Sequence, residues 1–254
     1  MAVDSLSLQV SAGQIKALIG PNGAGKTTVF NLVTAIHSLD SGQILVSGAR
    51  VSGLPSHRIA ALGVARTFQN VELFTNMSVL ENVMVGAHVR TGAGLASASL
   101  RLPGMLREEI GMAEKALRCL RLVGLGEVPP EQDARSLAFG QQRLLEVARG
   151  LAADPKLLLL DEPAAGLSTA ETARLAELVK RIRDLGVTVL LVDHDMDLVM
   201  RVSDEVVVLD HGVKIAEGTP REVQRDARVI AAYLGESEPA QGGDDCPQPT
   251  GEGN

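Results

Sequence analysis

The chain has 254 residues, 45% of them hydrophobic and 22% charged, a composition that suits one or two compact lobes with a buried core. Its apolar runs are much shorter than the roughly 20 residues of a membrane-spanning helix, so the sequence predicts no transmembrane segment. The net charge is −7, but residues 236–254 hold five acids and no base, which leaves the rest of the chain at −2. A domain that is nearly neutral lacks the overall positive charge typical of nucleic-acid-binding proteins, and we expect no nucleic-acid partner.

The start of the chain, its cysteines and its last residues bear on its location and domain organisation. No basic stretch followed by an apolar run stands at the start, so we expect no secretory signal and a cytoplasmic location. The two cysteines, Cys119 and Cys246, fit neither a disulfide framework nor a metal-ligand spacing. Residues 236–254 are rich in Gly, Pro and acids, which predicts a disordered acidic tail behind a main domain of residues 1–235.

Short apolar strands alternate with helical segments along most of the chain. One strand, Ile15 to Ile19, runs straight into Gly20. Further β-like segments share a short apolar pattern and lie at residues 6–10, 43–46, 63–68, 156–160, 187–192 and 205–209. Alternation of this kind predicts an α/β fold in which helices cover a parallel sheet.

A helical insert interrupts this alternation at about residues 76–153. Its helices are expected within residues 80–91, 106–125 and 140–155. Ser78 with Glu81 matches the S-x-x-E capping box, so a helix is expected to begin there. Ser168 with Glu171 matches the same pattern, and the helix behind it should bury one apolar face made of Leu175, Leu178, Val179, Ile182 and Leu185.

The strongest motif is a phosphate-binding loop. It matches G-x-x-x-x-G-K-[ST] in full and comprises Gly20, Pro21, Asn22, Gly23, Ala24, Gly25, Lys26, Thr27 and Thr28. Glycines let backbone N–H groups wrap phosphates, Lys26 can reach the β and γ phosphates, and Thr27 can ligate Mg²⁺. The alternative is a Gly-rich turn that precedes a helix, but the position between strand and helix favours the motif.

A second motif is the apolar strand LLLL that ends in Asp161 and Glu162. Asp161 could hold Mg²⁺ directly or through water. Glu162 should point to the other side, where a carboxylate could act as general base on an attacking water. Alone, such a strand could simply end in a polar turn; downstream of a phosphate loop it indicates a nucleotide site.

His194 follows another predicted central strand, at the edge where α/β sheets bind ligands. It could donate a hydrogen bond to the γ-phosphate. Two other interpretations stay open, a metal site made by Asp193, His194 and Asp195, and a solvated strand end. Strand alternation separates His194 from the two aspartates, which argues against the metal site.

Taken together, Lys26, Asp161, Glu162 and His194, with Gln69 in RTFQN and the segment LAFGQ (137–141), make the chain resemble an ATP-binding-cassette ATPase. The resemblance implies a P-loop NTPase (RecA-like) core with a small antiparallel β part and a helical subdomain. It implies a head-to-tail dimer in which the phosphate loop of one subunit faces the signature segment of a second ATPase, identical or related.

The resemblance also implies roles for individual residues. Lys26, Thr27 and Thr28 would bind phosphates, while Thr27, Gln69 and Asp161 would hold Mg²⁺. Glu162 would activate the attacking water and His194 would contact the γ-phosphate. The signature segment would contribute Ala138, Phe139, Gly140 and Gln141 to the ATP of the partner subunit.

Four segments make the chain most similar to the LivG-type ATPases of branched-chain amino-acid importers. They are GVARTFQNVELF (63–74), DEPAAGL (161–167), DHDMDLVM (193–200) and AAYLG (231–235). The implied partners are two membrane permeases and, indirectly, a substrate-binding protein, with the ATPase at the cytoplasmic face of the membrane. Alternatives are a cassette ATPase for another substrate such as lipid, a soluble cassette protein acting on DNA or ribosomes, and a non-hydrolysing subunit.

Two departures from the wider superfamily concern the site. Ala138 and Phe139 replace the Ser and first Gly of L-S-G-G-Q, which removes one hydroxyl donor, although the helix N-terminus behind them could still bind an anion. Ala followed by an aromatic residue is usual for the Liv group, so we interpret it as a subfamily trait. Ser168 stands where relatives have Asp or Asn, and all three residues cap helices.

The first residues contain no aromatic side chain on which adenine could stack. The five aromatic residues all come later, at Phe30, Phe68, Phe74, Phe139 and Tyr233. By resemblance, Ala2 to Leu8 match the interior of the family pattern, and the preceding strand and turn would hold the stacking aromatic residue. We therefore expect Met1 to be a truncated or misassigned start.

Overall fold

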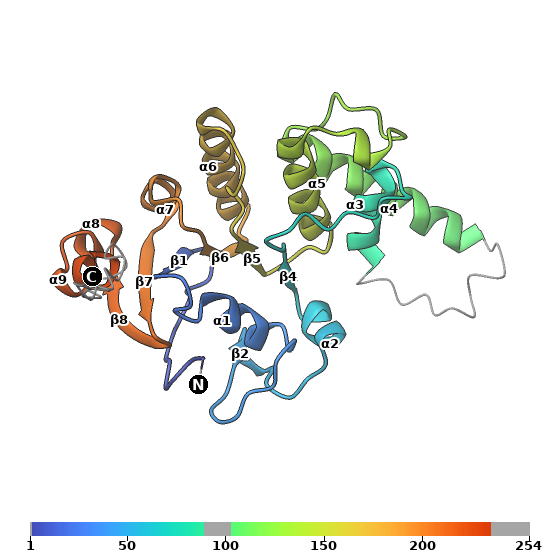
Figure 1. Ribbon diagram of the computed structural model, residues 1–254. Helices are drawn as coiled ribbons and strands as arrows, with labels where there is room; N and C mark the ends of the chain where they lie inside the picture. The colour runs from blue at the N-terminus through green and yellow to red at the C-terminus, as the bar shows by residue number, and fades with distance from the viewer. Residues whose placement is uncertain (1, 89–102, 235–254) are drawn as a thin grey trace, which may run out of the picture.

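A six-stranded sheet forms the centre of the protein, whose computed structural model describes residues 2–88 and 103–234 (Figure 1). Its order is β4-β5-β6-β1-β7-β8, and all neighbours are parallel except β7 and β8. The strands are β1 (Ile15–Ile19), β4 (Val64–Arg66), β5 (Leu157–Asp161), β6 (Thr188–Val192), β7 (Glu205–Asp210) and β8 (Val213–Gly218). A separate antiparallel pair is formed by β2 (Leu45–Val46) and β3 (Ala49–Arg50). The predicted α/β fold with a mainly parallel sheet and a small antiparallel part is confirmed.

Helices cover both faces of this sheet. They are α1 (Lys26–Val33), α2 (Ser56–Ala61), α3 (Val79–Ala87), α4 (Pro103–Val123), α5 (Phe139–Ala152), α6 (Thr169–Asp184), α7 (Met196–Val202), α8 (Pro220–Val223) and α9 (Ala227–Leu234). In Figure 1, α1 and α2 lie below the sheet, α6 and α7 lie above it, and α3, α4 and α5 form a group beyond β4.

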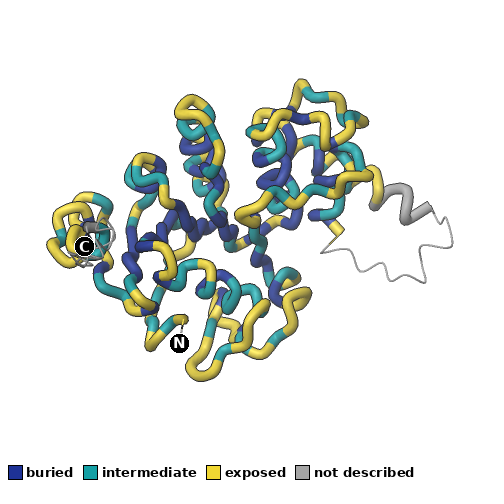
Figure 2. Tube along the Cα trace, viewed as in Figure 1, coloured by how far each residue is buried: buried dark blue, intermediate teal, exposed yellow. Residues whose placement is uncertain are grey.

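Strand alternation divides the core into two clusters. Ile15, Ala17 and Ile19 of β1 face a cluster that includes apolar side chains of α3 to α7. Leu18, from the opposite face of the same strand, joins Val29 and Phe30 of α1 in the second cluster. Successive strand residues point to opposite faces, so a strand buried on both sides is mostly apolar; Lys16, the one charged residue of β1, is paired with Glu205 and Glu217. Figure 2 shows this as a band of buried residues running through the sheet.

Two predicted helix starts are confirmed. Ser78 caps α3 and Ser168 caps α6, and in each case the serine accepts from the backbone N–H of the glutamate three residues on while that glutamate bonds back. The apolar face predicted for α6 is also buried, with one exception. Leu185 is 65% exposed because α6 ends at Asp184 and the chain turns away before Gly186.

The strand predicted at residues 6–10 is wrong. This segment has no regular secondary structure and pairs with no strand of the described sheet, although its alternating residues Leu6, Leu8 and Val10 pack on the second core cluster. Side chains bind its carbonyls instead: Lys214 Nζ donates to the oxygen of Ser7 at 2.8 Å and Lys16 Nζ to that of Gln9 at 2.6 Å. The alternating apolar pattern therefore predicted correctly which side chains are buried, but it did not predict whether the segment pairs with a neighbouring strand.

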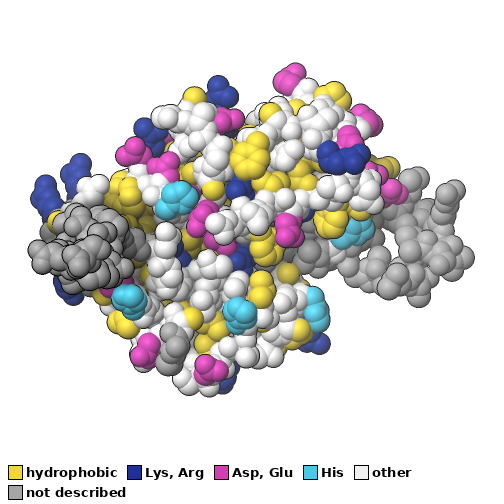
Figure 3. All heavy atoms as spheres, viewed as in Figure 1, with side chains coloured by type: hydrophobic (Ala, Val, Ile, Leu, Met, Phe, Trp, Pro, Cys, Tyr) yellow, Lys and Arg dark blue, Asp and Glu magenta, His cyan; other side chains and the backbone are white. Residues whose placement is uncertain are grey.

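Some predictions lie outside the described residues. They are the acidic tail at 236–254 and the end of the first insert helix at 89–91. Within the described ranges, no helix is both long enough and apolar enough to cross a membrane. On the face drawn in Figure 3, acidic and basic side chains are interspersed with exposed hydrophobic ones and form no single basic patch.

Candidate functional site

The phosphate loop connects the central strand β1 to α1 and is built from backbone. Gly20, Gly23 and Gly25 have φ values of 150°, 78° and 101°, which L-residues with side chains rarely adopt. A Cβ at Gly20 would lie 2.1 Å from the carbonyl oxygen of Leu209, so there is no room for one. Because α1 begins at Lys26, its first backbone N–H groups and the positive end of its dipole lie at the loop, an arrangement that suits an anion.

Lys26 adds a full positive charge to this loop. Its Nζ donates to the carbonyl oxygens of Gly20 at 2.7 Å and Pro21 at 2.8 Å, so the ammonium lies over the loop. Thr27 is exposed and Thr28 half-buried on the first turn of α1. The predicted loop residues therefore come together, and their chemistry suits a polyphosphate.

The end of β5 places the two predicted acids in different environments. Asp161 is buried, and its Oδ2 lies 2.7 Å from Nη2 of Arg66. Glu162 has φ 46°, the left-handed conformation, which is uncommon for a residue with a side chain and often found at functional sites. The two carboxylates consequently point to different neighbours, as the sequence predicts.

Glu162 is the meeting point of two other predicted site residues. Its Oε2 accepts a hydrogen bond of 3.0 Å from Nε2 of Gln69 and lies 3.6 Å from Nδ1 of His194. The imidazole is 69% exposed. A carboxylate with one amide donor, one imidazole and access to solvent has the arrangement that a general base for water needs.

Asp193 is structural. Its carboxylate is buried and accepts hydrogen bonds from the backbone N–H of Ala164 at 3.0 Å and of Asp195 at 2.8 Å. Burial raises its pKa, although the two hydrogen bonds oppose the rise. Asp195 caps α7 by accepting from the backbone N–H of Leu198. No cluster of three or more His, Cys, Asp or Glu that could hold a metal occurs in the described part of the chain.

Buried charges of α5 hold the chain on both sides of Gln69, which sequence reasoning missed. Arg143 donates to the carbonyl oxygens of Phe68 and Gln69, and Glu146 accepts from the backbone N–H of Phe68 at 2.9 Å. Arg149 donates to the carbonyl oxygen of Glu72 at 2.6 Å. The only sequence signal is the spacing of these three charges, every third residue on a helix that is otherwise apolar on that side.

The chain around Gln69, residues 66–77, is called the Gln69 segment below, and its other flank is held by α3. Asn82 is fully buried, and its Oδ1 accepts from the backbone N–H of Phe74 at 2.9 Å. Its Nδ2 donates to the carbonyl oxygens of Phe74 and Ser78, at 3.1 Å and 2.9 Å. On the side of α5, burial raises the pKa of Glu146, although the Phe68 N–H, Arg149 and Arg143 lower it.

Comparison with known proteins decides the family. The ABC transporter family matches residues 3–165, and the branched-chain amino acid ATP-binding cassette transporter family matches residues 213–239. The chain is 44% identical over 238 residues to the high-affinity branched-chain amino acid transport ATP-binding protein BraF of Pseudomonas aeruginosa, covering 93% of each. This chain belongs to the ATP-binding-cassette family. The predicted membership in its branched-chain amino-acid branch is confirmed.

Other cassette proteins are similar over the same length. The lipopolysaccharide export system ATP-binding protein LptB of Escherichia coli is 33% identical, with 92% of this chain and 91% of that protein covered. A solved nucleotide-free cassette of an ABC transporter has a TM-score of 0.79 at 29% identity, covering 91% of this chain and 92% of that one. A cassette solved in its ADP conformation has a TM-score of 0.78 at 29% identity and covers 92% of each chain. As a cassette ATPase, the chain binds nucleotide.

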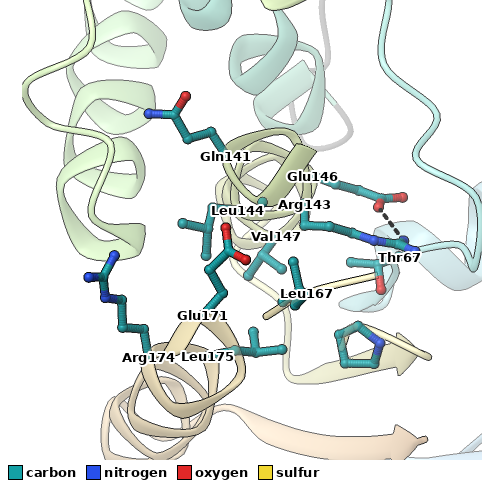
Figure 4. A pocket seen from close by; sticks show the side chains of 12 residues that line it. Thr67, Gln141, Arg143, Leu144, Glu146, Val147, Leu167, Glu171, Arg174 and Leu175 are labelled. Carbon is teal, nitrogen blue, oxygen red and sulfur yellow. Dashed lines mark ion pairs between the residues drawn. The ribbon is translucent and has the colours of Figure 1, made fainter. Parts of the chain in front are cut away.

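The predicted signature segment, Ala138 to Gln141, lies at the start of α5. A cavity of about 100 Å³ opens between α5 and α6 and is lined by Gly140 and Gln141 but by no residue of the phosphate loop (Figure 4). Gln141 Oε1 accepts from the backbone N–H of Ala138 at 3.2 Å, and Phe139 is 47% exposed. The cavity therefore places Gly140 and Gln141 beside residues of α6, such as Glu171 and Arg174.

The segment after Glu162 packs directly against the signature. A Cβ at Gly166 would lie 2.8 Å from Cε1 of Phe139, and one at Gly140 would lie 2.3 Å from Oε1 of Glu171. Glu171 thus lies beside the N-terminus of α5, where a negative charge is favourable. The chain after β5 and the start of α6 are thus packed against the first turn of α5.

Proposed function

We propose that this cassette ATPase binds Mg²⁺-ATP at its phosphate loop, hydrolyses it with Glu162 as general base, and energises uptake of branched-chain or related amino acids. The observation that carries the proposal is the position of Glu162. It lies directly after the strand that ends in Asp161, in contact with Gln69 and near His194. ATPase activity itself follows from the family.

The residues at the site suit Mg²⁺. Thr27, Gln69 and Asp161 offer hydroxyl, amide and carboxylate oxygens, the ligand type that Mg²⁺ prefers. The ion would neutralise charge on the β and γ phosphates. Lys26 and the N–H groups of residues 20–28 would bind the phosphates, and His194 would contact the γ-phosphate from the edge of β6.

A second ATPase subunit would complete the site. The signature segment (Ala138 to Gln141) lies at the start of α5 and the phosphate loop lies before α1, and we propose a head-to-tail dimer in which each ATP contacts both. The second subunit would be identical or related. We propose that residues 76–153 form a helical subdomain within a cassette of residues 1–235.

The proposed setting is the cytoplasmic face of the membrane, as a peripheral subunit on two permeases that receive amino acids from a substrate-binding protein. The identity to the branched-chain transport proteins is 44% and that to the lipopolysaccharide export protein 33%, which favours import. The match of the branched-chain family to residues 213–239 supports the same choice.

Replacement of the proposed base tests the mechanism. Glu162→Gln keeps the size of the side chain and an acceptor for Gln69 but cannot take a proton, so ATP turnover should fall by about 10²- to 10⁴-fold while ATP binding persists. Glu177→Gln is the matched control, because its side chain is 66% exposed on α6. Steady-state turnover and equilibrium ATP binding are measured for both. Unchanged turnover in Glu162→Gln would show that another group activates the water.

A further inference from the structure

Arg66 makes a buried ion pair that neither the motifs nor the proposed mechanism explain. It is the last residue of β4, and its side chain is only 6% exposed. Nη2 lies 2.7 Å from Oδ2 of Asp161, whose side chain is 3% exposed. An arginine buried in this way loses much hydration, so its position must be held by several partners.

Those partners come from the helix behind the phosphate loop and from the Gln69 segment. Nη1 of Arg66 donates to Oδ1 of Asn31 at 2.7 Å and to Oγ1 of Thr34 at 3.3 Å. The guanidinium carbon lies 5.4 Å from the ring centre of Phe30 and 5.0 Å from that of Phe68. Two rings and a helix therefore fix the plane of the guanidinium.

The geometry limits how Asp161 can meet a metal. Oδ2 is occupied by Arg66, whereas Oδ1 makes no hydrogen bond to any residue that the structure describes. Partners that orient a metal-binding carboxylate affect metal affinity strongly, although they do not touch the ion. A guanidinium that holds Oδ2 by Nη2, while its Nη1 is bonded to Asn31 and Thr34 of α1, restrains that oxygen and leaves Oδ1 for the ion.

We propose that Arg66 is a positioning residue for magnesium, which holds Asp161 by Oδ2 so that Oδ1 is presented to the ion. This inference rests on the proposed role of Asp161 at Mg²⁺. Arg66 also stacks on Phe68, the residue before Gln69, so movement of the Gln69 segment would reach Asp161 through the same guanidinium. The pair thus connects the Gln69 segment to the metal side of the site.

The test measures how much magnesium improves nucleotide binding. A non-hydrolysable ATP analogue with an imido bridge between the β and γ phosphates is titrated calorimetrically against the full chain, with EDTA or with Mg²⁺. The ratio of the two affinities is the magnesium gain. In Arg66→Met, this gain should fall by about 10- to 100-fold, while affinity in EDTA should change little. Arg66→Lys should also lose gain, because a single ammonium nitrogen cannot replace Nη2 at Asp161 and Nη1 at α1 together.

The matched control is Arg183→Met. Arg183 lies on α6, and its Nη1 is 3.2 Å from Oδ1 of Asp204, so it too is an arginine paired with an aspartate. Its ion pairs, with Asp184 and Asp204, involve neither Asp161 nor the Gln69 segment, so the magnesium gain should persist. Equal losses in EDTA and in Mg²⁺ for Arg66→Met would indicate a merely structural arginine and overturn the inference.

Asp161→Asn separates failure of this inference from failure of the proposed function. If that variant keeps the full magnesium gain, Asp161 does not serve the metal and the proposed function is wrong at that residue. If Asp161→Asn loses the gain but the Arg66 variants keep it, only the inference about Arg66 is overturned. If Arg66→Met does not fold, Arg66→Lys decides in the same way.

Discussion

The phosphate loop and the Gln69 segment lie on the same edge of one sheet but are built differently. The loop is backbone: its glycines and the start of α1 make the anion site, and Lys26 bonds to the loop's own carbonyls. The Gln69 segment is held from outside by buried side chains of α5 and α3, such as Glu146 and Asn82. A site made by backbone leaves a local motif in the sequence, whereas one held by distant side chains leaves almost none.

The largest expected effect is in the loop. Gly20→Ala places a Cβ 2.1 Å from the carbonyl oxygen of Leu209 at φ 150°, and the strand behind cannot yield. The free energy of unfolding should fall by about 3 kcal/mol or more. Gly23→Ala is the control, because nothing lies within 4 Å of its added Cβ and only the φ of 78° opposes it, at about 1 kcal/mol. Urea unfolding without nucleotide measures both; equal losses would contradict a steric origin.

Replacement of Glu146 should weaken the contacts by which α5 holds the Gln69 segment. Glu146→Ala removes the acceptor for the Phe68 N–H and leaves Arg143 and Arg149 without their buried carboxylate. Breaking a buried ion pair in this way should cost about 3 kcal/mol of stability. Glu114→Ala, with an exposed side chain on α4, should change stability by less than about 0.5 kcal/mol. A Glu146→Ala loss as small as that of Glu114→Ala would show that the network is not stabilising.

Replacement of Asn82 should loosen the same segment where it is bonded to α3. Asn82→Ala leaves the backbone N–H of Phe74 and two carbonyl oxygens without their side-chain partner, which should cost about 2 kcal/mol. Amide hydrogen exchange should rise at residues 70–77 and stay unchanged in β1. Exchange that rises equally in β1 would mean that the segment does not open separately from the sheet.

The two regions also explain what the sequence could and could not predict. The loop, Asp161 and Glu162 follow from apolar strands that end in diagnostic residues, so local pattern sufficed. Arg66 belongs to the RTFQN segment, yet its partner Asp161 lies 95 positions later and only the sheet order β4-β5 brings them together. The strand expected at residues 6–10 failed for a related reason, because alternation reports which side is buried and pairing depends on a neighbour elsewhere in the chain.

The capping box of α6 has the smallest expected effect, because it is local in sequence and exposed. Hydrogen bonds from the hydroxyl and backbone N–H of Ser168 lower the pKa of Glu171 below its ordinary value of 4.5. A carboxylate with a lowered pKa in the folded state stabilises the fold above the unfolded pKa, and this contribution disappears as the pH falls through the folded value. Thermal unfolding of Glu171→Gln should therefore differ from that of the parent at pH 7 and approach it in acid.

Ser168→Ala removes the hydroxyl that lowers the pKa of Glu171 and should cost about 1 kcal/mol at neutral pH. With that hydroxyl gone, a further Glu171→Gln change should produce a smaller pH-dependent difference than it does in the parent. The backbone N–H of Ser168 stays in that variant and should sustain only part of the difference, so a difference that persists unchanged would mean that Glu171 also acts through the N-terminus of α5 beside Gly140. In that case the carboxylate would belong to the signature segment as well as to its own helix, and the simplest local motif of the chain would have a long-range role.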